Sequence, residues 1–91
     1  MQKLEKRDIL ELMQQFKNWT LHNEQISAEW QFNDFSEAMI FINKVAALAE
    51  KHGHHPEIFN IYNRVRLTLS THDAGGLTQK DFDLARAINA L

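Results

Sequence analysis

The chain contains no cysteine, only one proline and only three glycines. Without thiols it can have neither a disulfide framework nor a thiolate nucleophile, and a zinc or iron–sulfur site built on cysteine is excluded. The single proline, Pro56, lies in mid-chain, and no Pro/Gly/Ser-rich linker or internal repeat is present. We therefore expect one domain over residues 1–91, since this length leaves no room for a second.

The sequence also lacks an excess of positive charge and a long apolar run. Ten Lys and Arg residues stand against twelve Asp and Glu residues, a formal net charge of -2, so no overall positive field attracts phosphate backbones. No apolar stretch approaches the roughly 20 residues of a membrane-spanning helix, and the N-terminus has no apolar signal segment. We expect no direct nucleic-acid partner, no membrane association and a cytoplasmic location.

The composition is that of a folded globular protein, with 44% hydrophobic and 24% charged residues. A chain this short buries only about 60–65% of the surface that its unfolded form exposes, which limits its stability. Many small proteins gain further stability by associating with copies of the same chain. We therefore expect at least a dimer.

Hydrophobic periodicity predicts a helix followed by a hairpin in the first third of the chain. Apolar residues recur at spacings of three and four over residues 6–18, as in an amphipathic helix. Large and polar residues then alternate over residues 19–22 and 26–32, on either side of a turn at Asn23-Glu24. The alternation predicts two strands with one buried face.

The next segment predicts a long helix with a clear start and end. A broad apolar stripe runs over residues 35–49, and Asn33 or Asp34 can cap its N-terminus. Gly53 stands where a left-handed residue commonly ends a helix. The aromatic residues of this region and of the strand before it, Trp30, Phe32, Phe35 and Phe41, are expected in the core.

Alternation returns over residues 58–62 and 64–71, which predicts a second hairpin with a turn near Asn63. A loop follows at residues 73–77, and Thr78 begins a capping-box-like start to a last helix. The order is therefore α-β-β-α-β-β-α. It predicts an α+β two-layer sandwich, with a four-stranded antiparallel sheet and helices packed on one face.

Four of the five histidines lie between positions 52 and 72. His54 and His55 follow the predicted long helix, and His72 follows the last strand. Because the end of a strand can lie beside the end of the helix packed on it, these three imidazoles can converge. Histidine has an unperturbed pKa of about 6.5, so it both donates and accepts protons near neutral pH, which suits general acid–base catalysis.

Other interpretations of this region are open. A bound zinc ion is an alternative interpretation, with the cluster of imidazoles and carboxylates as its ligands, although no His-Glu-x-x-His spacing is present. Ser70 and Thr71 lie close to His72 in sequence, but no nucleophile elbow surrounds them. Gly75-Gly76 indicates a backbone turn, since no phosphate-binding glycine pattern accompanies it. The cluster in question consists of Glu50, His52, His54, His55, His72 and Asp73.

Four segments of the sequence together resemble one known family. They are residues 32–38, residues 49–57 with His-His-Pro-Glu at positions 54–57, residues 62–65 with Tyr-Asn-x-Val, and residues 70–78 with Ser-Thr-His-Asp-Ala-Gly-Gly-Leu-Thr. This combination is similar to pterin-4a-carbinolamine dehydratase, and the likeness extends from about Trp19 to Ile88. It is more specific than any one of its short motifs.

The resemblance implies a dehydratase that removes water from a 4a-hydroxytetrahydropterin, the carbinolamine left by an aromatic amino acid hydroxylase, and forms quinonoid dihydropterin. It implies a pterin substrate, no metal and no redox cofactor, and a homodimer or homotetramer. The catalytic set carried over by similarity is His54, His55 and His72, with Glu50 orienting or polarising one of them. The implied substrate pocket consists of His54, His55, Pro56, Thr71, His72, Asp73 and Ala74.

The sequence departs from the family pattern at Ile58, where many relatives have tryptophan, and at Gly75, which replaces another small residue. Neither change removes a group that transfers protons. Some relatives that have lost the histidines serve as assembly factors. The alternative function is therefore a non-catalytic module of the same fold, which stabilises or dimerises a partner protein through a strand edge or helix surface.

Overall fold

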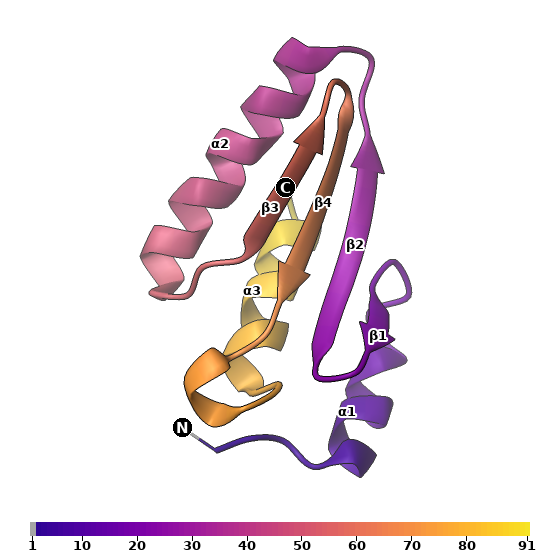
Figure 1. Ribbon diagram of the computed structural model, residues 1–91, viewed down its shortest axis with the longest axis vertical. Helices are drawn as coiled ribbons and strands as arrows, with labels where there is room; N and C mark the ends of the chain where they lie inside the picture. The colour runs from indigo at the N-terminus through magenta and orange to yellow at the C-terminus, as the bar shows by residue number, and fades with distance from the viewer. Residues whose placement is uncertain (1) are drawn as a thin grey trace.

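Two strands with alternating apolar residues form the centre of the sheet. In β2 (Gln25–Gln31) Ile26 and Ala28 are buried, and in β4 (Arg64–Leu69) every second residue is buried. The two strands pair antiparallel with Ala28 opposite Leu67. β1 (Thr20–His22) pairs with β2, and β3 (Glu57–Ile61) pairs with β4, which completes a sheet of order β1-β2-β4-β3. Figure 1 shows this arrangement in the computed structural model, which describes residues 2–91.

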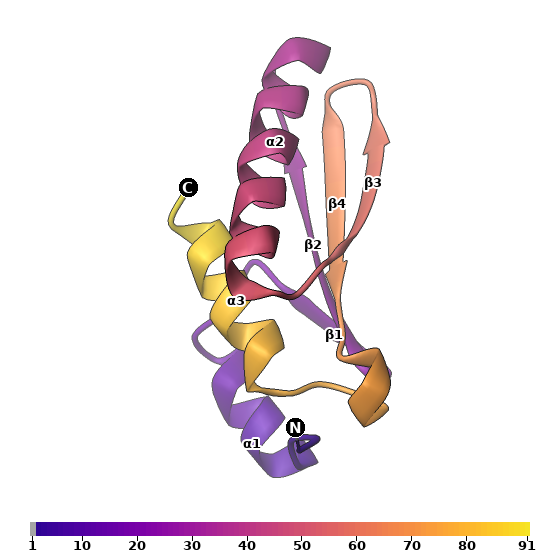
Figure 2. The ribbon, with the colours of Figure 1, turned by 90° about the vertical axis from the view of Figure 1, so that its left-hand side faces the viewer.

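Three helices lie on one side of this sheet. α2 (Phe35–His52) and α3 (Gln79–Asn89) lie side by side over it, and α1 (Lys6–Met13) lies near the β1 end (Figure 2). A single 3-10 turn, His72–Ala74, connects β4 to α3. The predicted α+β class, the element order and the four-stranded antiparallel sheet with helices on one face are confirmed.

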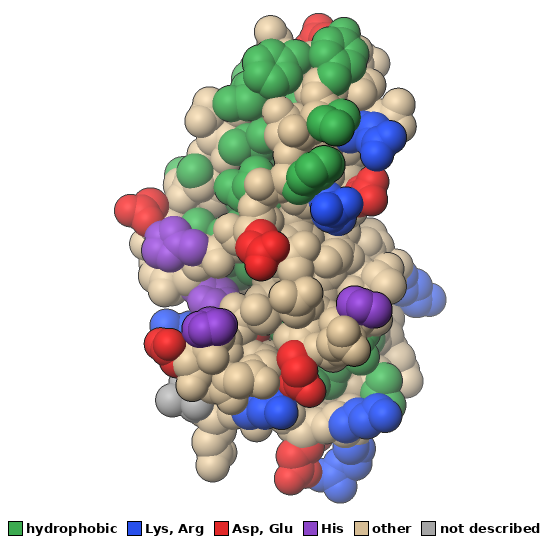
Figure 3. Space-filling model, viewed as in Figure 1, with side chains coloured by type: hydrophobic (Ala, Val, Ile, Leu, Met, Phe, Trp, Pro, Cys, Tyr) green, Lys and Arg blue, Asp and Glu red, His purple; other side chains and the backbone are tan. Residues whose placement is uncertain are grey.

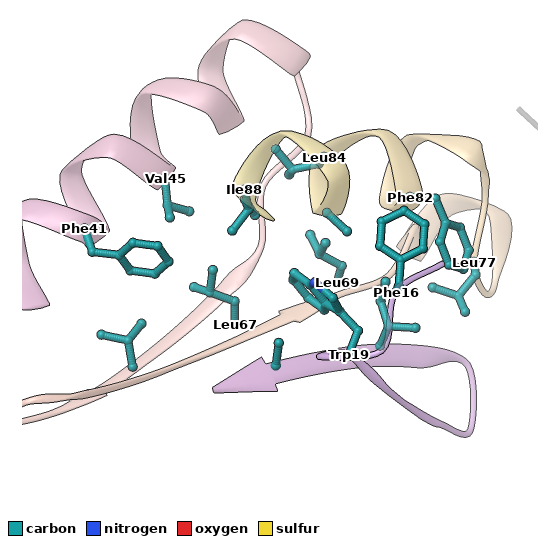
Figure 4. Close-up of a cluster of buried hydrophobic side chains, with 14 of the residues drawn as sticks. Phe16, Trp19, Phe41, Val45, Leu67, Leu69, Leu77, Phe82, Leu84 and Ile88 are labelled. Carbon is teal, nitrogen blue, oxygen red and sulfur yellow. The ribbon is translucent and has the colours of Figure 1, made fainter. Parts of the chain in front are cut away.

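The core lies between the sheet and the helices. β4 contributes Val65, Leu67 and Leu69, all of them fully buried, and α2 and α3 cover them with Val45, Phe82 and Ile88, among others (Figure 4). Phe16 and Trp19 close the core beside α1, and the rings of Phe16 and Phe82 pack 5.4 Å apart. The opposite face of the sheet is open and largely polar, because the alternate residues of β2 and β4 point there.

The first helix is shorter than its periodicity predicts. It ends at Met13, and residues 14–16 continue as a tighter turn in which each backbone N–H bonds the carbonyl three residues earlier. Phe16 is nevertheless buried. The apolar spacing persists beyond the helix because this turn, like a helix, points Phe16 inward.

The second hairpin also differs from its prediction at two points. The strand ends at Ile61, because Tyr62 has a φ of 47° and belongs to the turn. β4 ends at Leu69, since Thr71 pairs only with Gly76 in an isolated bridge and the 3-10 turn follows.

Phe35 is 49% exposed at the start of α2, so its expected place in the core is wrong, whereas Phe41 is buried.

Among residues 2–91, no helix is both long enough and apolar enough to cross a membrane.

Replacing Leu67 by Ala should lower the free energy of unfolding by about 2–5 kcal/mol, because the change leaves a cavity at a fully buried position. Leu10→Ala is the matched control, since Leu10 is 49% exposed on α1, and it should cost about 1 kcal/mol or less. Urea denaturation followed by tryptophan fluorescence measures both. Equal losses would contradict the assignment of Leu67 to the centre of the core.

Candidate active site

The end of α2 turns sharply and delivers two adjacent histidines. Gly53 adopts the left-handed conformation with φ 61°, and the backbone N–H of His54 bonds the Ala49 carbonyl at 3.1 Å. Glycine adopts this conformation without the penalty that a Cβ atom brings, which is why the helix stops here as predicted. His54 and His55 therefore leave the helix together and lead through Pro56 into β3.

A cavity of about 420 Å³ lies where this segment meets the 3-10 turn and the start of α3. Figure 3 shows histidine side chains gathered in this region, below the lower end of α2. The volume falls in the range of small-molecule sites. Its lining residues are Gly53, His54, His55, Ser70, Thr71, His72, Asp73, Ala74 and Lys80.

The structure thus brings together six of the residues that the resemblance implies: His54, His55, Thr71, His72, Asp73 and Ala74. Two others lie outside the cavity wall. Glu50 contacts His55 from the last turns of α2, and Pro56 follows that histidine in the chain. Three lining residues, Gly53, Ser70 and Lys80, were not among the predicted site residues.

His54 is held by a buried carboxylate. Its Nε2 atom lies 2.6 Å from Oδ1 of Asp81, and the side chains are 12% and 0% exposed. Because a carboxylate accepts hydrogen bonds, Nε2 is the donor, which leaves Nδ1 free to exchange a proton with another group. This pairing fixes both the tautomer and the ring orientation.

Asp81 has further partners on its second oxygen. Oδ2 accepts from the Thr71 hydroxyl at 2.8 Å and from the backbone N–H of Thr78 at 2.9 Å. The hydroxyl groups of Thr71 and Thr78 are themselves 2.7 Å apart. A buried carboxylate needs several donors to offset the loss of hydration, and three separate segments of the chain supply them here.

Sequence reasoning assigned no site role to Asp81. The available signal was its position three residues after Thr78, and the capping of α3 accounts for that spacing. The structure gives the same side chain a second contact, with His54, which lies 27 residues earlier. That contact depends on the packing of α3 beside the end of α2, which the sequence pattern does not indicate.

His55 and His72 have more exposed surroundings. Nε2 of His55 lies 2.5 Å from Oε2 of Glu50, in a pair whose side chains are 66% and 77% exposed. His72 lies on the exposed 3-10 turn, and its ring makes no hydrogen bond within residues 2–91. Two of the three imidazoles are therefore paired with carboxylates, and the third has no hydrogen-bond partner among the described residues.

The remaining histidines lie outside the cavity wall. His22 ends β1, and His52 is the last residue of α2. Within the part of the chain that the structure describes, no group of three or more His, Asp or Glu side chains is arranged to hold a metal ion.

Comparison with known proteins identifies the family. A family model described as pterin 4 alpha carbinolamine dehydratase matches residues 2–91. A protein of Acidobacterium capsulatum that provisionally carries the name pterin-4-alpha-carbinolamine dehydratase is 52% identical over 91 residues, covering 100% of this chain and 99% of that protein.

Solved structures agree with this match. The crystal structure of a transcriptional coactivator/pterin dehydratase from Brucella melitensis has a TM-score of 0.91 at 40% identity, over 97% of this chain and 96% of that one. A pterin dehydratase-like protein described as a RuBisCO assembly factor of the alpha-carboxysome shares the fold, with a TM-score of 0.64 at 22% identity over 79% of this chain and 83% of its own. The chain belongs to the pterin-4a-carbinolamine dehydratase family, as the sequence motifs indicated.

Replacing Asp81 by Ala should lower the free energy of unfolding by about 3 kcal/mol, because one buried and two partly buried donors lose their acceptor. Asp83→Ala is the control on the same helix. Asp83 is exposed and accepts only from Gln79, so its loss should change stability by about 0.5 kcal/mol or less. Urea denaturation compares the two, and equal effects would argue against a stabilising role for the Asp81 contacts.

Proposed function

We propose that this chain dehydrates a 4a-hydroxytetrahydropterin to quinonoid dihydropterin by general acid–base catalysis. The observation that carries the proposal is the cavity of about 420 Å³ that three imidazoles line, two of them paired with carboxylates. Membership of the dehydratase family supports the choice of substrate.

The reaction needs one acid and one base. The bond between C4a and the hydroxyl oxygen breaks, and a protonated imidazole supplies the proton with which that oxygen leaves as water. A neutral imidazole accepts the proton that a ring nitrogen of the substrate gives up. The electron pair of the C4a–O bond leaves with the oxygen, the lone pair of the neighbouring ring nitrogen forms the new carbon–nitrogen double bond, and the pair of the broken N–H bond stays on that nitrogen. The step therefore requires neither an oxidant nor a metal.

His54, His55 and His72 are the proposed catalytic residues, and each can serve in either role. Each carboxylate partner keeps a proton on Nε2 of its histidine and turns Nδ1 toward exchange with substrate. Glu50 would orient His55 in this way. Asp81, which the sequence reasoning missed, would orient His54 as a positioning residue.

The remaining parts of the pocket would hold the bicyclic ring. Thr71, Asp73 and Ala74 line the cavity on the 3-10 turn side, and Pro56 is proposed at its rim next to His55. The hydroxyl of Thr71 already donates to Asp81, so it can offer substrate only its oxygen as an acceptor.

The broader setting follows from the same proposal. We propose that residues 1–91 form a single dehydratase domain that acts in the cytoplasm after an aromatic amino acid hydroxylase has released its carbinolamine product. No resident metal or redox cofactor is part of the proposed reaction.

We also propose that the chain forms a homodimer or homotetramer. Exposed apolar side chains are concentrated on β3, its turn and α2, where Figure 3 shows a green patch in the upper part of the view. β3 is an edge strand that pairs only with β4, and such edges favour pairing with another chain. These exposed residues, on both faces of the β3 edge, are Phe35, Ile40, Ile58, Phe59, Ile61 and Tyr62, which are 43% to 63% exposed. Ile58 lies on the helix side of β3, opposite Leu67, whereas Phe59 and Ile61 lie on its other face, opposite Arg66 and Arg64.

The same patch supports an alternative function, namely a binding module that stabilises a partner protein without catalysis. The RuBisCO assembly factor of similar fold is an example of such a role in another protein. The two functions differ in what they require: catalysis depends on the three histidines, whereas a binding module depends on surface residues of the strands or helices.

The decay of 4a-hydroxytetrahydropterin, followed by stopped-flow ultraviolet absorbance in the presence of a chelator, tests the enzyme directly. The wild-type chain should accelerate decay, and His55→Ala combined with His72→Ala should reduce the catalysed rate by about 10²-fold to 10⁴-fold. His22→Ala is the matched control, because His22 lies on β1 away from the cavity. Decay no faster than in buffer, with correctly folded protein, would refute the dehydratase and favour a partner protein.

Size-exclusion chromatography with light scattering tests the association. The wild-type chain should have a mass two or four times its monomer mass of 10.7 kDa. Ile58→Arg combined with Ile61→Arg should shift it to the monomer, because two charges would be buried at the contact. Leu10→Arg changes an equally exposed leucine on α1 and should leave the mass unchanged. A wild-type monomer would contradict the proposal.

A further inference from the structure

Among residues 2–91, Lys80 is the one lysine or arginine that lines the cavity, and nothing in the proposed proton transfers uses it. It is the second residue of α3, is partly buried, and shares the cavity wall with His54, His55 and His72. Within residues 2–91 its ammonium forms no ion pair with any carboxylate. A cation in a pocket wall without a protein partner is available to a bound molecule.

The nearby carboxylates do not neutralise this charge. Asp81 lies one residue further along α3, but its two oxygens already accept from His54, Thr71 and Thr78. Asp73 lines the same cavity without pairing with Lys80. The first turn of a helix adds partial positive charge of its own. This side of the cavity therefore favours an oxygen acceptor and disfavours a group that presents N–H donors.

The chemistry of the proposed substrate offers such an acceptor close to the reacting atom. In a 4a-hydroxytetrahydropterin the carbonyl carbon C4 is bonded directly to C4a, the atom that loses its hydroxyl. When C4a lies among the three imidazoles, the C4 oxygen must lie within the same cavity. An amino group at C4 would instead point its own donors at the ammonium.

We propose that Lys80 donates a hydrogen bond to the C4 oxygen of the bound ring and thereby selects 4-oxo pteridines against 4-amino pteridines. The inference rests on the proposed pterin site and adds a specificity-determining residue to it. Lys80 touches neither the departing hydroxyl nor the ring proton in this scheme, so its role is recognition and orientation.

Binding of two stable analogues measures this selection: pterin, which is 2-amino-4-oxopteridine, and 2,4-diaminopteridine. Their Kd values are obtained by fluorescence titration against the wild-type chain and three variants, after circular dichroism and urea denaturation have established that each variant is folded. Wild type should bind pterin at least about tenfold more tightly, as expected for a hydrogen bond from a charged donor. Lys80→Met should bring the ratio of the two Kd values close to one.

Two further variants act as controls. Lys80→Arg keeps a cationic donor at the same position and should retain most of the preference for the 4-oxo compound. Lys44→Met removes an exposed lysine from α2, outside the cavity wall, and should leave both Kd values unchanged. A loss of preference in Lys44→Met as well would overturn the proposal, because the effect would then come from net charge alone.

The design separates failure of this inference from failure of the proposed function. If folded wild-type protein binds no pterin, the pterin site itself is wrong. If wild type binds pterin and Lys80→Met keeps the same ratio, the site stands and the role of Lys80 is overturned. A second analogue pair, 6-hydroxymethylpterin and pterin-6-carboxylic acid, differs only at the C6 substituent, which is neutral in the first compound and anionic in the second. If Lys80→Met changes the ratio of Kd values for this second pair alone, the proposed role of Lys80 is also overturned, because Lys80 would then contact the C6 substituent.

Discussion

The geometry of the cavity depends on one buried carboxylate. Asp81 accepts hydrogen bonds from the segment after α2 through His54, from the segment after β4 through Thr71, and from the start of its own helix through Thr78. Burying a charged group is costly unless its donors are all in place. The three segments therefore satisfy Asp81 only in one mutual arrangement, which is the arrangement that forms the cavity.

The two-layer core brings these segments within reach of one another. β4 ends beneath the start of α3, and α2 packs beside α3, so the C-terminal end of one helix lies near the N-terminal end of the other (Figure 2). Gly53 then stops α2 at the point where its next residues can turn toward Asp81. Packing of ordinary apolar residues thus sets the position of the polar ones, and a few local conformations set their direction.

Much of the fold could be predicted because each element has its own signal in the sequence. Alternation marked β2 and β4, Asp34 and Gly53 marked the two ends of α2, and the histidine cluster marked the site. The contact between His54 and Asp81 had no such signal, since capping alone explains the spacing between Thr78 and Asp81. The end of α1 was missed because Phe16 points inward from a tighter turn as it would from a helix.

The exposure of Phe35 illustrates a further limit on prediction. Periodicity identifies the apolar stripe of a helix, but the width of the sheet beneath decides how much of that stripe is covered. Here β3 is the last strand, and the start of α2 extends beside the turn that follows it (Figure 1). Apolar residues at this end consequently remain exposed on a single chain.

The strand order has a consequence for how the chain folds. β3 and β4 are joined by a short turn and can pair early, but the central pairing of β2 with β4 joins residues that the whole of α2 separates. Closing such a loop loses chain entropy before any distant contact compensates, and pairings of this kind slow the folding of small domains. His54 and Asp81 lie on opposite sides of the β3–β4 hairpin in the sequence, so their contact can form only after α3 has packed beside the end of α2. A folding intermediate with just the second hairpin would therefore have no cavity, and binding competence should appear together with the last cooperative step.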